Sequence, residues 1–364
     1  MPASILNKMN DIFFELVRVA IGTQDTLSRA PSVDEWKLLY DMAKKQSLVG
    51  ICFAAVQRLT EDERPPEMLY LTWMGMAAKI QQHNEVMNTH TAKTLEYFRS
   101  KGFQCCVLKG QGIAKLYCDL AGLRQSGDID VWVNSSRKEL YELSKKELGK
   151  ITGLTYHHIH YEMFEDVDVE AHTWPSFFTN PIHNKLFQKF CLKNAPIEGC
   201  GDYAPLAFNR VFILQHCFGH FCGHGVGFRQ LLDYYFVLKQ GFSEEERLES
   251  MTWIDKLGMG RFAAALMWVC IHVFGMDRKL CICEPNEKDG EFLLAEVLQT
   301  GNMGHQDERV DHRKLQSALG RYLHNIKRDW QIMRIAPSYA LWEPLWGIYQ
   351  YTWVKITNNR YNRK

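Results

Sequence analysis

The sequence has no excess of charge of either sign. Its 364 residues include 43 Lys and Arg against 42 Asp and Glu, a formal net charge of +1. Sequence-independent binding to DNA or RNA depends on clustered cations that neutralise phosphates. No general nucleic-acid binding is therefore expected, although a small local basic pocket remains compatible with this balance.

Long apolar runs and paired cysteines are also lacking. A membrane-spanning helix needs about 18 or more consecutive apolar residues, and no such run occurs, so no membrane association is expected. The first residues show no signal-peptide pattern, and the predicted location is the cytoplasm. There is no Cys-x-x-Cys pair among the 11 cysteines. An odd, scattered set in a chain of this size favours reduced core thiols over disulfides or zinc.

What is present is mainly helical periodicity. Residues 4–100 show it throughout, with Ser32 or Asp34 as the expected cap of one helix and a long helix over 67–99 that ends before Gly102. It returns after Pro205, and the later helices are predicted at 208–220, 228–239, 244–257, 260–274, 313–334 and 342–354.

Between these helical parts the pattern changes to that of strands. A helix is expected over 137–148 after a cap at Ser135. Strands are predicted at 104–108, 128–133, 156–164 and 166–172, the last two as a hairpin or as paired strands. The predicted fold is α+β and mostly helical, with a small mixed β-sheet module flanked by N- and C-terminal helical segments. The expected division is 1–100, 101–200 and 201–364.

The stretch that carries chemistry combines a glycine turn with two aspartates on a strand. Asp128 and Asp130 alternate along their strand and so share one face. Like-charged carboxylates this close repel each other unless a cation lies between them. Two Mg²⁺ ions would supply that cation and would bridge phosphates. Backbone N–H groups at Gly110, together with Lys109, could face those phosphates.

A third carboxylate is expected on a neighbouring strand. Glu170 is the best candidate, with Asp168 on the same strand face as the alternative. Taken alone, this second pair would be read as a solvated strand face. Its partnership with Asp128 and Asp130 is what favours a site.

These motifs resemble a known group of enzymes. The resemblance is to the polymerase-β-like nucleotidyltransferase superfamily. It is carried by Lys109-Gly110, then Arg124 and Gly127-Asp128-Ile129-Asp130, then Glu170-Ala171-His172. The sequence is most similar to the bacterial "uncharacterised nucleotidyltransferase" family, whose helical pattern also matches the segment from His216 through Arg229 to Asp233.

The resemblance implies a catalytic module at 101–200 that moves a nucleoside monophosphate from an NTP to a hydroxyl of an unidentified acceptor, with release of pyrophosphate. ATP is the first choice of nucleotide, and the implied cofactor is Mg²⁺, as two ions, with Mn²⁺ as an alternative. The implied catalytic and metal-binding residues are Asp128, Asp130 and Glu170. The implied nucleotide-binding residues are Lys109, Gly110, Gln111, Arg124, Gly127, His216, Arg229 and Asp233.

One position departs from the superfamily pattern. Gln111 stands where the wider superfamily has serine at the phosphate turn, so phosphate binding would depend on backbone amides, Lys109 and Arg124. Two other functions stay open: a toxin-like nucleotidyltransferase that acts on tRNA or protein, and a catalytically inactive interaction scaffold.

Several further patterns have a plain structural alternative. His216 and His220 have the spacing of zinc hydrolases, but Cys217 replaces the glutamate those enzymes need. Arg229 and Asp233 are spaced for an ion pair within one helix. A metal site at His157, His158 and His160 is possible, but a solvated strand face is favoured. The basic residues of 313–334 could form an acceptor-binding face, although such runs are more commonly solvated. The helical spacing of Trp342, Trp346, Tyr349 and Trp353 predicts that they belong to the core.

Overall fold

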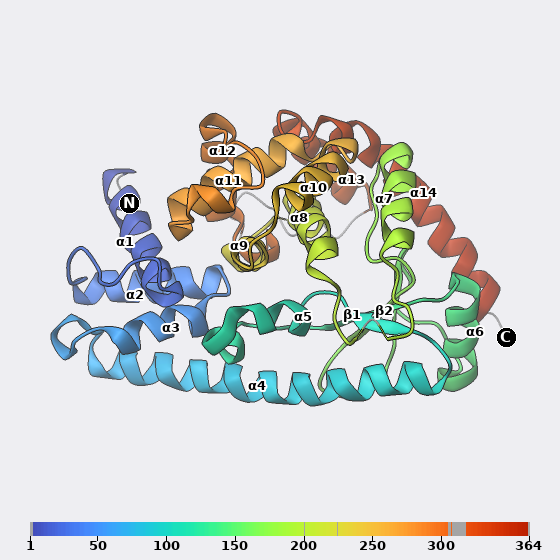
Figure 1. Cartoon of the computed structure of the whole chain (residues 1–364), viewed down its shortest axis with the longest axis horizontal. Coiled ribbons are helices and arrows are strands. Elements are labelled where there is room, and N and C mark those ends of the chain that lie inside the picture. The colour runs from blue at the N-terminus through green and yellow to red at the C-terminus, as the bar shows by residue number, and fades with distance from the viewer. Residues whose placement is uncertain (1–2, 200, 224, 305–306, 308–317, 363–364) are drawn as a thin grey trace.

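The computed structural model describes residues 3–199, 201–223, 225–304, 307 and 318–362. Figure 1 shows a long helix, α4, along one side of the molecule, with the strands and α5 between it and the C-terminal helices. The mostly helical α+β fold with a small mixed sheet is confirmed.

The helices before the sheet are α1 (Ala3–Ile21), α2 (Val33–Lys45), α3 (Val49–Arg58), the short η1 (Glu61–Glu63) and α4 (Glu67–Ser100). The predicted long helix is thus confirmed. It ends as expected, since the N–H of Gly102, at φ 86°, donates to the carbonyl oxygen of Arg99. Of the two predicted caps, Ser32 is the one that accepts from the backbone of α2.

The sheet has the order β1-β2-β4-β3. Strand β2 is antiparallel to β1 and parallel to β4. Strand β3 is antiparallel to β4, so the predicted pairing of the last two strands is confirmed. The parallel register places Asp130 beside Glu170. The strands are β1 (Cys105–Val107), β2 (Ile129–Val133), β3 (His158–His160) and β4 (Val169–His172).

Between the strands lie α5 (Gln111–Ala114), η2 (Lys115–Leu123) and α6 (Arg137–Leu148). The cap of α6 is Ser136 rather than the predicted Ser135. The reason is the capping box: Ser136 Oγ accepts from the N–H of Glu139, whose carboxylate accepts from the N–H of Ser136.

The helices after the sheet are α7 (Pro181–Lys193), α8 (Leu206–Cys222), α9 (Phe228–Lys239), α10 (Glu244–Lys256), α11 (Gly260–Phe274), η3 (Arg278–Leu280), α12 (Glu287–Thr300), η4 (Asn302–Gly304), α13 (Ala318–Ile332) and α14 (Pro337–Asn362). Helix α7 is not among the predicted helices. Its start nevertheless carries two recognisable signals, an Asn180 cap and Pro181 in the first turn.

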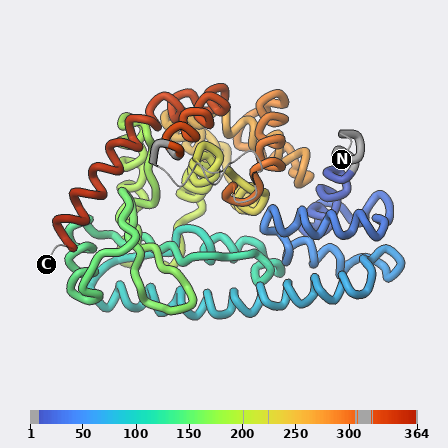
Figure 2. The backbone as a smooth tube through the Cα atoms, turned by 180° about the vertical axis from the view of Figure 1, so that it is seen from behind, coloured from blue at the N-terminus to red at the C-terminus, as the bar shows by residue number. Residues whose placement is uncertain are grey.

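Two hydrophobic cores hold these elements together. The larger one joins α1–α3 to α8, α9 and α11, and the smaller one lies among the sheet, α6 and the second half of α4. At the far end of the chain, α14 returns to the sheet module (Figure 2), where the side chain of Asn362 bonds both the N–H and the carbonyl oxygen of Ile151 at 2.9 Å. The division into three domains stays a prediction.

The aromatic residues of α14 only partly match their prediction. Trp342 and Tyr349 are 36% and 49% exposed, so the prediction that they are core is wrong. They lie on a surface groove beside α7. No described cysteine forms a disulfide, and most are buried, as expected. Among the described helices, none combines the length and apolar character needed to cross a bilayer.

The basic segment also differs from its prediction. Arg313 lies outside the described residues. Arg328 forms an ion pair with Glu296, and Arg334 binds Asp289 at 2.6 Å. Both cations therefore bind carboxylates of α12, whereas Lys327 is exposed, as a solvated face predicts.

Candidate functional site

A cavity of about 410 Å³ lies where the ends of β2 and β4 meet α8 and α9. Its walls contain every predicted site residue except Gln111 and Asp233. Those that line it are Lys109, Gly110, Arg124, Gly127, Asp128, Asp130, Glu170, His216 and Arg229.

The centre of the cavity is a group of charges around Asp130, which is 1% exposed. Its Oδ1 contacts Lys109 Nζ and His172 Nε2, each at 2.9 Å. His172 Nε2 also lies 3.3 Å from Glu170 Oε2. Burial opposes the charge on Lys109, but the neighbouring carboxylates of Asp130, Asp128 and Glu170 raise its pKa above the ordinary value.

The same balance fixes the charge of the other two groups. Burial disfavours an imidazolium, yet hydrogen bonds to Asp130 and Glu170 raise the pKa of His172 to about 9. Burial also disfavours the Glu170 carboxylate, but the hydrogen bond from His172 lowers its pKa to about 2. The Glu170 carboxylate is thus ionised beside two cations of the chain itself, Lys109 and His172.

The donors of this cluster fit a divalent cation. Asp130 Oδ2 is buried and has no hydrogen-bond partner, which is costly for a carboxylate oxygen. Oxygen and nitrogen donors of Asp130, Glu170 and His172 lie within 4.8 Å of one another. Asp128 lines the same cavity directly before β2. A hard cation such as Mg²⁺ takes oxygen ligands of this kind.

The histidines of β3 do not form the solvated face that the sequence pattern favours. His158 is only 10% exposed in its side chain, and its Nδ1 lies 3.3 Å from Glu170 Oε2. His160, 42% exposed in its side chain, lies 3.6 Å from Glu170 Oε1. The prediction fails for His158 because β3 is hydrogen-bonded to β4 with His160 opposite Glu170, which turns these rings toward the carboxylate.

Arg124 lines the cavity, but most of its guanidinium is engaged elsewhere. Its Nε and Nη2 donate to the two carboxylate oxygens of Asp233, each at 2.7 Å, and its Nη1 donates to Ser126 Oγ at 3.2 Å. The Tyr117 hydroxyl donates to Asp233 as well, at 2.7 Å. Asp233 is therefore a buried anchor for Arg124. The predicted contact of Arg124 with phosphates stays a prediction.

This pairing corrects the expected ion pair within α9. Asp233 binds Arg124, far away in the sequence, and Arg229 instead donates from Nη1 to the carbonyl oxygen of Gln125 at 3.1 Å. Arg229 Nε is buried without a partner. Burial and the adjacent Arg124 lower the pKa of Arg229. Arg124 and Arg229 thus place two guanidinium groups in the wall of one cavity.

Gln111 does not line the cavity, and its side chain instead joins neighbouring segments of the chain. Its side chain is buried, donates to Asn88 Oδ1 at 2.6 Å and accepts from Ser126 Oγ at 2.7 Å. A chain of hydrogen bonds thus runs from α4 through Gln111 and Ser126 to Arg124. It fixes the segment that leads into β2.

The turn before α5 needs a glycine. Gly110 has φ 55° and ψ −113°, a conformation that L side chains rarely adopt. Opposite this turn, His216 lines the cavity with its ring 4.4 Å from that of His220. Burial and the nearby charge of His220 lower the pKa of His216, so this imidazole is neutral.

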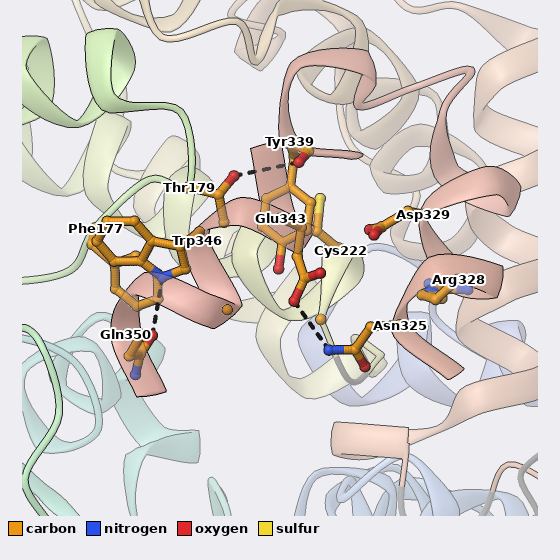
Figure 3. Close-up of a pocket in the computed structure, with 12 residues that line it drawn as sticks. Phe177, Thr179, Cys222, Asn325, Arg328, Asp329, Tyr339, Glu343, Trp346 and Gln350 are labelled. Carbon is orange, nitrogen blue, oxygen red and sulfur yellow. Dashed lines mark hydrogen bonds between the residues drawn. The ribbon is translucent and has the colours of Figure 1, made fainter. Parts of the chain in front are cut away.

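A second cavity, of about 260 Å³, is drawn in Figure 3. It adjoins the first, since Phe177, Gly223 and Tyr339 line both. Its other walls come mainly from α13 and α14, where Asp329 and Glu343 are its two carboxylates. Neither residue is among the predicted site residues. The one signal in the sequence is Glu343, an acid within the aromatic pattern of α14.

Comparison with known proteins supports the resemblance. A family model described as "Uncharacterised nucleotidyltransferase" matches residues 32–275. No curated protein and no solved structure gives a significant match. The matched segment contains the whole predicted site and ends with α11, before the helices that form the second cavity.

Proposed function

The chain belongs to the uncharacterised nucleotidyltransferase family, and we propose that it transfers a nucleoside monophosphate from an NTP to an acceptor hydroxyl, with release of pyrophosphate. The observation that carries this proposal is the buried Asp130 carboxylate with its unpartnered Oδ2, beside Glu170 and opposite Arg229 in one cavity. Carboxylates and guanidinium groups in one cavity suit a metal-bound triphosphate.

In this proposal Asp128, Asp130 and Glu170 hold Mg²⁺, with Mn²⁺ as an alternative. The bound cation would neutralise charge on the triphosphate and lower the pKa of the acceptor hydroxyl. His172 keeps Glu170 oriented and ionised through the 3.3 Å contact.

The triphosphate would lie toward Lys109, Arg229 and the backbone of the turn at Gly110. Lys109 is already charged and at the cavity wall, and Arg229 has an unpartnered N–H there. Arg124 acts mainly behind this wall, where it holds α9 against the segment before β2 through Asp233. ATP is the proposed nucleotide.

The reaction joins the acceptor oxygen to the α-phosphorus and breaks the bond from that phosphorus to the bridging oxygen of the pyrophosphate. The hydroxyl proton passes to an ionised carboxylate of the site, for which Glu170 is the first candidate. Lys109 and Arg229 stabilise the charge that grows on the departing pyrophosphate.

Asp128 and Asp168 provide a matched test. They occupy equivalent places directly before the parallel strands β2 and β4, but Asp128 lines the cavity whereas Asp168 is exposed outside it. We expect Asp128→Asn to lower the rate of nucleotidyl transfer by about 10²–10³-fold without loss of folding, and Asp168→Asn to leave it unchanged. Equal rates in both variants would refute the metal-site assignment.

Binding separates the remaining alternatives. Calorimetry with ATP, CTP, GTP and UTP in the presence of Mg²⁺ tests the nucleotide, and binding of none of them would favour the scaffold alternative. Incubation with α-labelled ATP and a cell lysate then shows which fraction becomes labelled. Label in tRNA or protein would favour the toxin-like alternative.

A further inference from the structure

The second cavity indicates which kind of acceptor the protein uses, provided that the proposed transfer reaction holds. It opens beside the first cavity, and Phe177 and Tyr339 belong to the walls of both. A molecule bound here would therefore reach the site of transfer without crossing solvent.

One side of this cavity is aromatic. The rings of Phe177 and Trp346 are stacked with centroids 5.1 Å apart, and Tyr339 adjoins them (Figure 3). Trp346 Nε1 donates to Gln350 Oε1 at 3.0 Å, which fixes the indole. Aromatic faces of this kind attract ammonium and guanidinium groups through their quadrupoles.

The other side carries two carboxylates that form no ion pair within the described part of the chain. Asp329 is 5% exposed, its Oδ2 has no hydrogen-bond partner, and its carboxylate points to the Glu343 side of the cavity in Figure 3. Glu343 accepts a neutral hydrogen bond from Asn325 Nδ2 at 3.0 Å. The adjacent cation, Arg328, is engaged by Glu296 and by the carbonyl oxygen of Phe221.

Burying an unpaired carboxylate is costly. Burial, the charge of Glu343 and a hydrogen bond with its carboxyl group raise the pKa of Asp329 to about 7. A ligand that brings a positive charge would remove this cost.

We propose that the second cavity is the acceptor subsite and that the acceptor is a small molecule with a protonated amine or guanidinium group as well as its reacting hydroxyl. The cation binds between Asp329, Glu343 and the aromatic wall. The hydroxyl extends past Phe177 and Tyr339 into the first cavity, where its oxygen displaces pyrophosphate from the α-phosphorus.

Charge-based fractionation tests this class of acceptor directly. A bacterial small-molecule extract is separated on a cation exchanger at pH 7, and each fraction is incubated with the full-length protein, Mg²⁺ and α-labelled ATP. We expect labelled product from the retained fraction and none from the flow-through. Product formed only from the flow-through would overturn the proposal.

Variants connect the result to the cavity. Asp329→Asn and Glu343→Gln should raise the KM for the retained fraction at least tenfold and leave binding of ATP with Mg²⁺ unchanged. Glu291→Gln, which removes an exposed carboxylate of α12, is the control and should behave as wild type. An unchanged KM in Asp329→Asn would show that the acceptor binds outside the second cavity and would overturn the proposal.

The two proposals fail in different ways. Absence of binding of any of ATP, CTP, GTP and UTP by the wild-type protein would refute the transferase function itself. Binding of ATP with no label from the retained fraction would refute only the cationic acceptor. A melting temperature of Asp329→Asn at or above that of the wild type excludes misfolding as the cause of any effect.

Discussion

The buried ion pair between Arg124 and Asp233 can be tested by a double-mutant cycle. Replacing Asp233 by Leu removes two charge-assisted hydrogen bonds of 2.7 Å each and leaves the guanidinium buried without its counter-charge. The Tyr117 hydroxyl loses its acceptor in the same variant. Breaking one side of a buried pair costs about 3–5 kcal/mol of unfolding free energy. We expect a loss in that range for Asp233→Leu, and a similar one for Arg124→Met.

Removing both partners should cost much less than the sum. In Arg124→Met/Asp233→Leu no charge is left uncompensated, and buried pairs replaced by apolar residues of similar volume are often close to neutral. Urea denaturation followed by circular dichroism gives the four free energies. A favourable coupling of at least about 3 kcal/mol, the size of one single-variant loss, would establish the pair. Lys44→Met, which removes an exposed helix pair with Asp41, is the control and should cost about 0.5 kcal/mol or less.

The cycle also decides what Arg124 does. If it positions the wall, the double variant should retain most of its affinity for ATP with Mg²⁺. Additive losses of stability, or unchanged stability in Arg124→Met combined with lost ATP binding, would refute the positioning role and make Arg124 a phosphate ligand instead.

Two further predictions concern pH and backbone conformation. Burial and the charge of Glu343 raise the pKa of Asp329 to about 7 in the folded state, whereas the unfolded chain has an ordinary value of about 4. Protonated Asp329 therefore contributes its full share of folding stability below about pH 4, and this contribution is lost as the pH rises through 7. After a discount for solvent screening, Asp329→Asn should stabilise the protein by on the order of 1–2 kcal/mol at pH 8 and little at pH 4, and thermal melts with equal gains at both pH values would contradict this. Gly110→Ala should cost about 1–3 kcal/mol and weaken ATP binding, whereas Gly75→Ala, in exposed α4 with nothing within 4 Å of the added Cβ, should be stabilising by up to about 1 kcal/mol. Equal melting temperatures for the two alanine variants would show that the turn carries no strain.

The carboxylate cluster could be predicted from the sequence because it depends on local rules. Alternation places Asp128 and Asp130 on one face of β2, and a neighbouring strand with the same alternation supplies Glu170. The pairing of Asp233 could not be predicted in the same way. Its spacing from Arg229 favours a pair within α9, and only tertiary packing shows that the backbone of Arg124, held at its carbonyl oxygen by Asn84, presents its guanidinium to both oxygens of Asp233.

The second cavity was beyond sequence reasoning for a different reason. Phe177 lies in the segment after β4, whereas Asp329 and Glu343 lie on two helices near the end of the chain. No local periodicity relates these positions. From the sequence, Asp329 would also be predicted to be solvent-exposed, because it follows Lys327 and Arg328 in a basic helix.

The position of the two cavities along the chain bears on how the acceptor is selected. Every residue proposed to hold the metal or the phosphates lies between 109 and 233, inside the segment that matches the family at 32–275. Asp329, Glu343 and Trp346 lie after that segment. On our proposal, the transfer step belongs to the family-wide part of the chain, and acceptor charge is selected by α13 and α14. Substitutions at Asp329 should therefore change which acceptor is used while the nucleotide stays the same, and substitutions at Asp128 should slow transfer to every acceptor alike.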